Sequence, residues 1–283
     1  MCTLALNSNV PRKALKKRPE QSRPEGEVLE DDIVAFAKNR LDFDPDPQQA
    51  ALLRSNARRG ILNCTRQWGK STVMAVKAVH RAYTKPGSLV LVASPTARQS
   101  GEWMRKARGM VELLGIKPVG DGTNQISIAL PNGSRIVGLP GTNTEGRIRG
   151  FSAVSLLLID EAARVSDSMY KALRPMLAIG GGELWMMSTP LGKCGFFYDT
   201  WVASESVASE SNTSWARIEV RAVDCPRISR EFLEEERDAM GSAWFDREYQ
   251  CRFIDDGSSV FSRDLVEAAL DPTIEPLHLP PWH

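Results

Sequence analysis

The residues from Gly60 to Tyr83 constrain the fold of this chain more than any other stretch. The short apolar segment Gly60–Cys64 is typical of a buried strand, and Thr72–Tyr83 has the composition of a helix. Between them lies a loop that ends in Gly-Lys-Ser-Thr. It matches the end of the phosphate-binding pattern G-x-x-x-x-G-K-[ST], although Cys64 stands where the first glycine is expected. A strand, a loop and a helix in this order are the context that a phosphate-binding loop requires.

An acidic pair at the end of another apolar segment supports the same interpretation. Val154–Ile159 predicts a buried strand, and Asp160 and Glu161 follow it. Lys70 would then lie near the β- and γ-phosphates of a nucleotide. Ser71 and Asp160 are the candidate ligands of Mg²⁺, and Glu161 is the candidate general base for an attacking water. The alternative is that Asp160 caps a helix and Glu161 lies at its positive end, but the upstream Gly-Lys-Ser makes this less convincing.

Strand and helix signals alternate along most of the chain. Continuous apolar strands separated by helices predict an α/β fold with a mostly parallel sheet and helices on both faces. Pro131–Gly133 predicts a hairpin turn between two of the strands. Further strands are expected at residues 88–94, 124–130, 135–139 and 184–188, and further helices at 31–39, 48–58, 98–114 and 170–179.

Composition excludes several classes of protein. The 36 Lys+Arg and 35 Asp+Glu residues give a formal net charge of +1, so the overall charge does not by itself indicate a nucleic-acid partner. The five cysteines lack C-x-x-C spacing, which argues against a zinc knuckle and a disulfide framework. No apolar run reaches the ~18 residues that a transmembrane helix needs. The N-terminus has the reverse order of a secretory signal, so we expect a protein that is neither secreted nor membrane-bound.

The two ends differ in composition from the middle. Residues 1–26 are rich in Pro, Lys, Arg and Glu and predict a disordered basic arm, which either contacts nucleic acid or is a solvated tail. We expect a P-loop ATPase domain at residues 27–256. Residues 257–283 are expected to form a linker or C-terminal tail.

Together these features resemble the ATPase half of the large terminase subunit of tailed bacteriophages and prophages, from about Asp44 to Phe261. The loop of that family reads Arg-x-x-Gly-Lys-Ser/Thr without the leading glycine, as Arg66–Ser71 does. The resemblance implies a RecA-like P-loop NTPase fold of the ASCE type. It also implies that Arg66 approaches the γ-phosphate, the alternative being a surface salt bridge. The implied nucleotide contacts in the loop are Arg66, Gln67, Trp68, Gly69, Lys70, Ser71 and Thr72.

Three further segments match the family. Pro45–Gln49 resembles its adenine-recognising segment, with Gln49 as the reader of the base edge and Gln48 as the alternative. Gly146–Gly150 resembles an arginine-glycine segment, from which Arg149 would reach the ATP of a neighbouring subunit. Arg147 is the second choice, and contact with the DNA backbone or simple solvation remains open for this loop. The motif that couples hydrolysis to movement in the family corresponds to Ser188, Thr189 and Pro190.

The resemblance implies an ATP-hydrolysing, Mg²⁺-dependent motor that translocates double-stranded DNA into a procapsid, in the cytoplasm of a bacterial host. The implied partners are duplex DNA, the small terminase subunit, the portal ring and further copies of the chain in a homo-oligomeric ring. Family members continue into an RNase H-like nuclease. Because no acidic cluster of that kind follows Phe261, we expect no DNA cleavage by this chain. The alternatives are a superfamily-two helicase fragment and a catalytically silent prophage remnant that acts in assembly.

Overall fold

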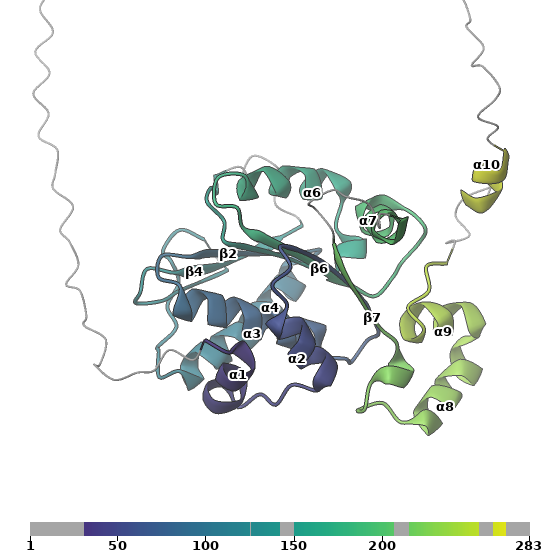
Figure 1. Ribbon diagram of the computed structural model, residues 1–283, viewed down its shortest axis with the longest axis horizontal. Helices are drawn as coiled ribbons and strands as arrows, with labels where there is room; N and C mark the ends of the chain where they lie inside the picture. The colour runs from purple at the N-terminus through teal and green to yellow at the C-terminus, as the bar shows by residue number, and fades with distance from the viewer. Residues whose placement is uncertain (1–30, 125, 142–149, 207–214, 255–262, 270–283) are drawn as a thin grey trace, which may run out of the picture.

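The computed structural model describes residues 31–124, 126–141, 150–206, 215–254 and 263–269. A seven-stranded sheet with the order β3-β4-β2-β5-β6-β1-β7 lies at the centre of these residues (Figure 1). Neighbouring strands are parallel, except that β3 runs antiparallel to β4 in the predicted hairpin. The strands are β1 (Arg59–Cys64), β2 (Leu89–Ser94), β3 (Ser127–Ala129), β4 (Arg135–Pro140), β5 (Leu156–Asp160), β6 (Glu183–Ser188) and β7 (Ala216–Val220).

Helices cover both faces of the sheet because successive side chains of its inner strands point to opposite sides. Leu158 and Trp185 pack in the cluster beneath α3 and α4, whereas Leu157 and Met186 pack in the cluster beneath α6 and α7. The predicted mostly parallel α/β fold is thereby confirmed. One layer contains α1 (Ile33–Leu41), α2 (Pro47–Arg54), α3 (Lys70–Thr84) and α4 (Ala97–Leu113); the other contains α6 (Asp167–Leu173), α7 (Gly195–Ser206) and the 3₁₀ turns η1 (Ala162–Arg164) and η2 (Arg174–Leu177).

The segment after β7 is anchored to the end of β1. It contains η3 (Ala222–Asp224), α8 (Arg230–Met240) and α9 (Ser242–Tyr249), and α9 lies beside the β7 edge in Figure 1. The side-chain amide of Asn63 donates to the Cys251 carbonyl at 2.7 Å, and the Thr65 hydroxyl donates to the Glu248 carbonyl at 2.9 Å. These buried hydrogen bonds hold the end of α9 against the loop that follows β1. Beyond it, α10 spans Arg263–Ala269.

Two expected helices differ from the observed ones. The helix expected at 48–58 begins at Pro47 and ends at Arg54, because Ser55 is extended and leads into β1. The helix expected at 170–179 begins at Asp167, and η2 replaces its second half. Pro175 lies in η2, and proline has no backbone N–H for an α-helical hydrogen bond. Within the described ranges, no helix has both the length and the apolar character needed to cross a membrane.

Candidate active site

The candidate site lies where the carboxyl ends of β1, β5 and β6 meet. The strand β6 lies between β1 and β5, and all three run parallel, so the residues that follow them share one edge of the sheet. Ligands of open parallel sheets bind at this edge. Lys70 and Ser71 follow β1 by way of the loop, Asp160 ends β5, and Ser188 ends β6. The topology thus brings together side chains that are far apart in the sequence.

The loop after β1 is shaped by two residues with left-handed backbone conformations. Gln67 has φ 64° and Gly69 has φ 91°, and glycine adopts such values without the cost that a Cβ imposes. Trp68 lies between them with a fully buried side chain, which anchors the loop to the core. The loop then enters α3 at Lys70, whose helix N-terminus presents unpaired N–H groups. This arrangement is suited to binding phosphate oxygens.

Cys64 is part of the strand and not of the loop. It is the last residue of β1 and is fully buried. Burial raises the pKa of its thiol to about 12, so the side chain is neutral near pH 7. The position where the common pattern has a glycine is therefore filled here by a small core residue.

The four chemistry-bearing side chains predicted from the sequence form two contacting pairs at the start of α3. The Ser71 hydroxyl donates to the two carboxylate oxygens of Asp160 at 3.3 and 3.2 Å. Lys70 Nζ lies 3.0 Å from Glu161 Oε1. Asp160 accepts from Ser71 while it is still part of β5, so its side chain is not the cap of the turn that follows. A hydroxyl, a carboxylate, an ammonium group and a second carboxylate thus surround the first turn of α3.

The electrostatics of the site favour a bound cation. Burial raises the pKa of Asp160 to about 6, and the neighbouring Glu161 carboxylate adds to this effect. Burial opposes the charged form of Lys70, but the neighbouring Cys64, Glu161 and Asp160 side chains outweigh burial and raise its pKa. A buried carboxylate beside a hydroxyl supplies the hard oxygen atoms that Mg²⁺ prefers. Ser71 and Asp160 therefore fit the predicted Mg²⁺ ligands on chemical grounds.

Glu161 is held from several directions. Its backbone lies in the left-handed region at φ 51°, a conformation that costs energy for a non-glycine residue and that clusters at functional sites. Arg164 Nη1 lies 3.0 Å from Glu161 Oε2 and also donates to the Thr189 hydroxyl at 3.1 Å. The Ser188 hydroxyl lies 3.5 Å from the same Oε2. The predicted coupling residues Ser188 and Thr189 are therefore next to the predicted base.

The predicted base reader and the loop arginine are both engaged by protein groups. The Gln49 amide donates to the Trp68 carbonyl at 2.9 Å and accepts from the Asp46 N–H at 3.1 Å. The second of these bonds is half of a capping box at the start of α2. Arg66 Nε lies 2.7 Å from Glu248 Oε2, so the exposed arginine forms an ion pair with a buried carboxylate of α9. In this conformation Gln49 braces the loop and Arg66 points to α9.

Comparison with protein families decides which class this arrangement belongs to. Residues 61–268, well over half of the chain, match the model of the family described as terminase large subunit, T4likevirus-type, N-terminal. This chain belongs to that family. The match includes the loop, the acidic pair, α8, α9 and all but the last residue of α10.

Individual terminases show the same likeness. The large subunit of Thermus virus P23-45 is 25% identical over an alignment of 249 residues, and the match covers 78% of this chain and 51% of that protein. The chain thus spans about half the length of the curated relatives it matches. The ATPase domain of the Thermus phage P74-26 large terminase has a TM-score of 0.67 at 22% identity, covering 77% of this chain and 97% of that domain. The HK97 bacteriophage large terminase has a TM-score of 0.61 at 17% identity, covering 78% of this chain and 55% of that one.

The structure also describes some of the other residues proposed for the terminase site. Gln67 is exposed, Thr72 is half-buried in the first turn of α3, and Pro190 is buried after β6. Arg149, proposed as the finger that acts on a neighbouring subunit, lies outside the described residues, as does Arg147.

Sequence reasoning missed three residues that contact the site. Arg164 follows Glu161 by three residues. This spacing favours an ion pair in a helical turn, so the contact could have been predicted from the sequence. Arg227 donates to the Trp68 carbonyl at 2.6 Å, and Glu248 contacts Arg66, but both come from distant segments whose docking has no sequence pattern. They are brought to the site by the β1–β7 pairing and by α9.

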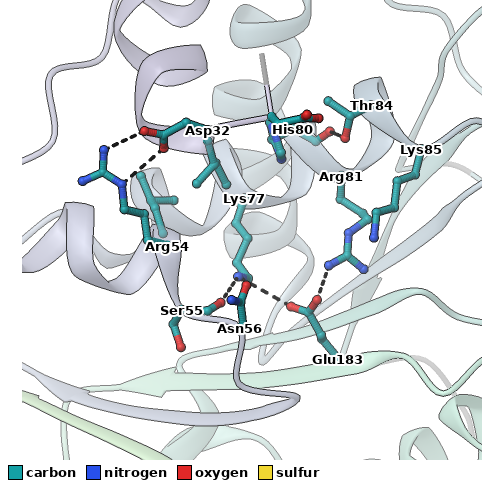
Figure 2. Close-up of a pocket in the computed structure, with 13 residues that line it drawn as sticks. Asp32, Arg54, Ser55, Asn56, Lys77, His80, Arg81, Thr84, Lys85 and Glu183 are labelled. Atoms are coloured by element: carbon teal, nitrogen blue, oxygen red, sulfur yellow. Dashed lines mark hydrogen bonds and ion pairs between the residues drawn. The ribbon is translucent and has the colours of Figure 1, made fainter. Parts of the chain in front are cut away.

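A cavity of about 410 Å³ lies at the other end of the strands, between α1, α2, α3 and the start of β6. Figure 2 shows Lys77 and Arg81 pointing to Glu183, and Arg54 pointing to Asp32. Burial lowers the pKa of Lys77, which lies 3.5 Å from Glu183. These charges are paired with one another across packed elements. We therefore assign this cluster a structural role, joining α3 to β6.

Proposed function

We propose that the described site binds Mg·ATP and hydrolyses it. The observation that carries the proposal is the contact of Ser71 with Asp160 and of Lys70 with Glu161 at the N-terminus of α3. The large terminase of a thermophilic bacteriophage, similar to this chain in fold, has been solved in complex with ADP and with ATP-gamma-S. Those complexes support a nucleotide as the ligand of this fold.

Each residue has a distinct part in the proposed reaction. The loop N–H groups and Lys70 bind the β- and γ-phosphates, and Ser71 and Asp160 would hold Mg²⁺. When bound, Mg²⁺ neutralises negative charge on the phosphate oxygens. Glu161 accepts a proton from the attacking water as general base. For Arg66 to reach the γ-phosphate, its guanidinium has to leave Glu248.

The adenine contact is proposed for the start of α2. Gln49 remains the candidate, and reading the base edge requires it to give up a bond to Trp68 or Asp46. Gln48 is adjacent, and its Oε1 has no hydrogen-bond partner among the described residues. Either glutamine could therefore contact the adenine base, and both lie in the first turn of α2.

We further propose that hydrolysis drives translocation of double-stranded DNA during packaging, as membership of the terminase family suggests. Duplex DNA, a small terminase subunit, a portal ring and further copies of this chain are the proposed partners. In such a ring Arg149 would act on the ATP of a neighbouring subunit. The proposed place of action is the cytoplasm of a bacterial host.

Steady-state ATP hydrolysis with and without DNA tests this proposal. We expect turnover by the wild-type chain that duplex DNA stimulates more than single-stranded DNA does. Lys70→Ala should lower turnover by about 10²-fold or more, since it removes a charged phosphate ligand. Lys171→Ala, an exposed lysine of α6, is the matched control and should leave turnover unchanged. Turnover that survives Lys70→Ala would contradict the site. Turnover that DNA does not stimulate would contradict the proposal that hydrolysis drives DNA translocation.

A further inference from the structure

The Arg164 side chain contacts three separate parts of the site. Its Nη1 lies 3.0 Å from Glu161 Oε2 and 3.1 Å from the Thr189 hydroxyl. Its Nη2 lies 3.8 Å from Glu248 Oε1 on α9. The Arg164 side chain as a whole is 25% exposed, so about three-quarters of it is buried. One cation thus joins the turn after β5, the end of β6 and α9.

We propose that Arg164 is a positioning residue: it fixes the orientation of the Glu161 carboxylate and links that carboxylate to Thr189 and to α9. The proposal rests on the proposed function, in which Glu161 is the general base. It adds a residue that is expected to act on the reaction through Glu161, without touching the nucleotide.

The contacts of Glu161 show why an orienting group is needed. Lys70 occupies Oε1 at 3.0 Å and Arg164 occupies Oε2 at 3.0 Å. With both of its oxygens engaged in this way, the carboxylate has no free oxygen to face an attacking water. In the proposed reaction Lys70 binds phosphate oxygens, which frees Oε1. Arg164 then keeps Oε2 in place, so that Oε1 faces the phosphate side of the site.

Apart from Lys70, whose Nζ is also 3.0 Å away, the remaining side-chain contact of the Glu161 carboxylate among the described residues is longer than the Arg164 contact. The Ser188 hydroxyl lies 3.5 Å from Oε2, beyond the usual range of an O–H···O hydrogen bond. The left-handed backbone of Glu161 is itself a conformation that neighbouring contacts must hold. Among the described residues, Arg164 is therefore the main group that orients this carboxylate once Lys70 has left it.

The link to α9 runs through Glu248. Its side chain is only 5% exposed and lies near three guanidinium groups: Arg66 at 2.7 Å, Arg247 at 3.3 Å and Arg164 at 3.8 Å. A continuous chain of charges therefore joins Arg66 in the loop, Glu248 in α9, Arg164 and Glu161. Because Thr189 shares the Arg164 guanidinium, a shift at the end of β6 is transmitted to the base by the same group.

The experiment compares Arg164→Ala and Arg164→Lys with the wild-type chain. The quantities measured are kcat for ATP hydrolysis and the Kd of ATP-gamma-S with Mg²⁺, with kcat normalised to the number of binding sites. We expect Arg164→Ala to lower kcat by about 10- to 100-fold, the scale of a lost positioning contact, while Kd changes by less than about 3-fold. Arg164→Lys should recover part of kcat, because a cation remains near Oε2 but the fork of donors is lost. Arg221→Ala removes an exposed arginine of the same i,i+3 type and is the control for general effects.

A double variant tests whether Arg164 acts through Glu161. If it does, Glu161→Gln with Arg164→Ala should be no slower than Glu161→Gln alone. Additive losses of kcat, an unchanged kcat in Arg164→Ala, or parallel losses of kcat, affinity and Tm would each overturn the positioning role. A wild-type chain without turnover would instead contradict the proposed function itself, and this assignment with it. The two failures are distinguished by the wild-type rate.

Discussion

The buried carboxylate of Asp160 leads to a prediction about stability that does not depend on catalysis. Its pKa is 3.8 in the unfolded reference and about 6 in the folded chain, because burial and the Glu161 charge disfavour ionisation. A pKa that is raised on folding means that the ionised group destabilises the folded state. This penalty is complete above about pH 6 and disappears as the pH falls toward 3.8.

The size of the effect follows from the pKa difference. A difference of about two pH units corresponds to roughly 3 kcal/mol at pH 8, and this is an upper limit for a neutral replacement. We therefore expect Asp160→Asn to raise the free energy of unfolding of the metal-free chain by about 1–3 kcal/mol at pH 8, with a Tm higher by several degrees. At pH 4 the two chains should be nearly equal in stability.

Denaturant and thermal unfolding in EDTA, at pH 8 and at pH 4, measure this difference. Asp121→Asn is a control of opposite sign. Burial alone would raise the pKa of Asp121, but hydrogen-bond donors from Asn124, Thr123 and Ser127 lower it to about 2. Replacement of Asp121 should therefore destabilise the folded chain at pH 8. An Asp160→Asn variant that is no more stable than the wild-type chain at pH 8 would refute the reasoning.

Three other changes have expected outcomes. Glu183→Ala leaves the buried Lys77 without its carboxylate partner and should lower the free energy of unfolding by about 3–5 kcal/mol, measured by denaturant unfolding. As a control, Glu102→Ala at the exposed pair with Arg105 should lower it by less than about 1 kcal/mol. Gln49→Ala removes the capping box and the bond to the Trp68 carbonyl, so we expect a loss of about 1–2 kcal/mol of unfolding free energy and weaker ATP-gamma-S binding. Gln99→Ala, which removes the side-chain acceptor of the Thr96 hydroxyl at the exposed start of α4, should leave binding unchanged. Gly69→Ala places a Cβ at φ 91° and 3.3 Å from Gln49 Nε2, and calorimetry should show weaker nucleotide binding with a stability loss of about 1–3 kcal/mol.

The sequence was sufficient for the parts of the site that depend on local patterns. The apolar strand before the loop, the Gly69-Lys70-Ser71 run and the acidic pair after β5 are each readable in a short window. Because parallel strands expose the residues after them at one edge, those windows also predicted that Lys70, Ser71, Asp160 and Glu161 lie close together. The structure places them in two contacting pairs.

The parts that sequence reasoning missed depend on long-range docking. The strand β7 has only one fully buried residue, Val220, and pairs with β1 through backbone groups that leave little side-chain signal. Glu248 reaches Arg66 because Thr65 and Asn63 hold the segment around α9, and neither bond has a sequence signature. The Gln49 contact was partly readable, since Asp46 and Gln49 have the spacing of a capping box.

The most direct test of the proposed site is the behaviour of Glu161→Gln with Mg²⁺ and ATP. We predict that this variant binds ATP-gamma-S with a Kd within a few-fold of the wild-type value, while kcat falls by about 10²–10⁴-fold, the usual contribution of a general base. Binding with lost turnover is the result expected if Glu161 accepts the proton from water at a nucleotide held by Lys70, Ser71 and Asp160. Turnover close to the wild-type rate would contradict the account, because a different group would then have to activate the water.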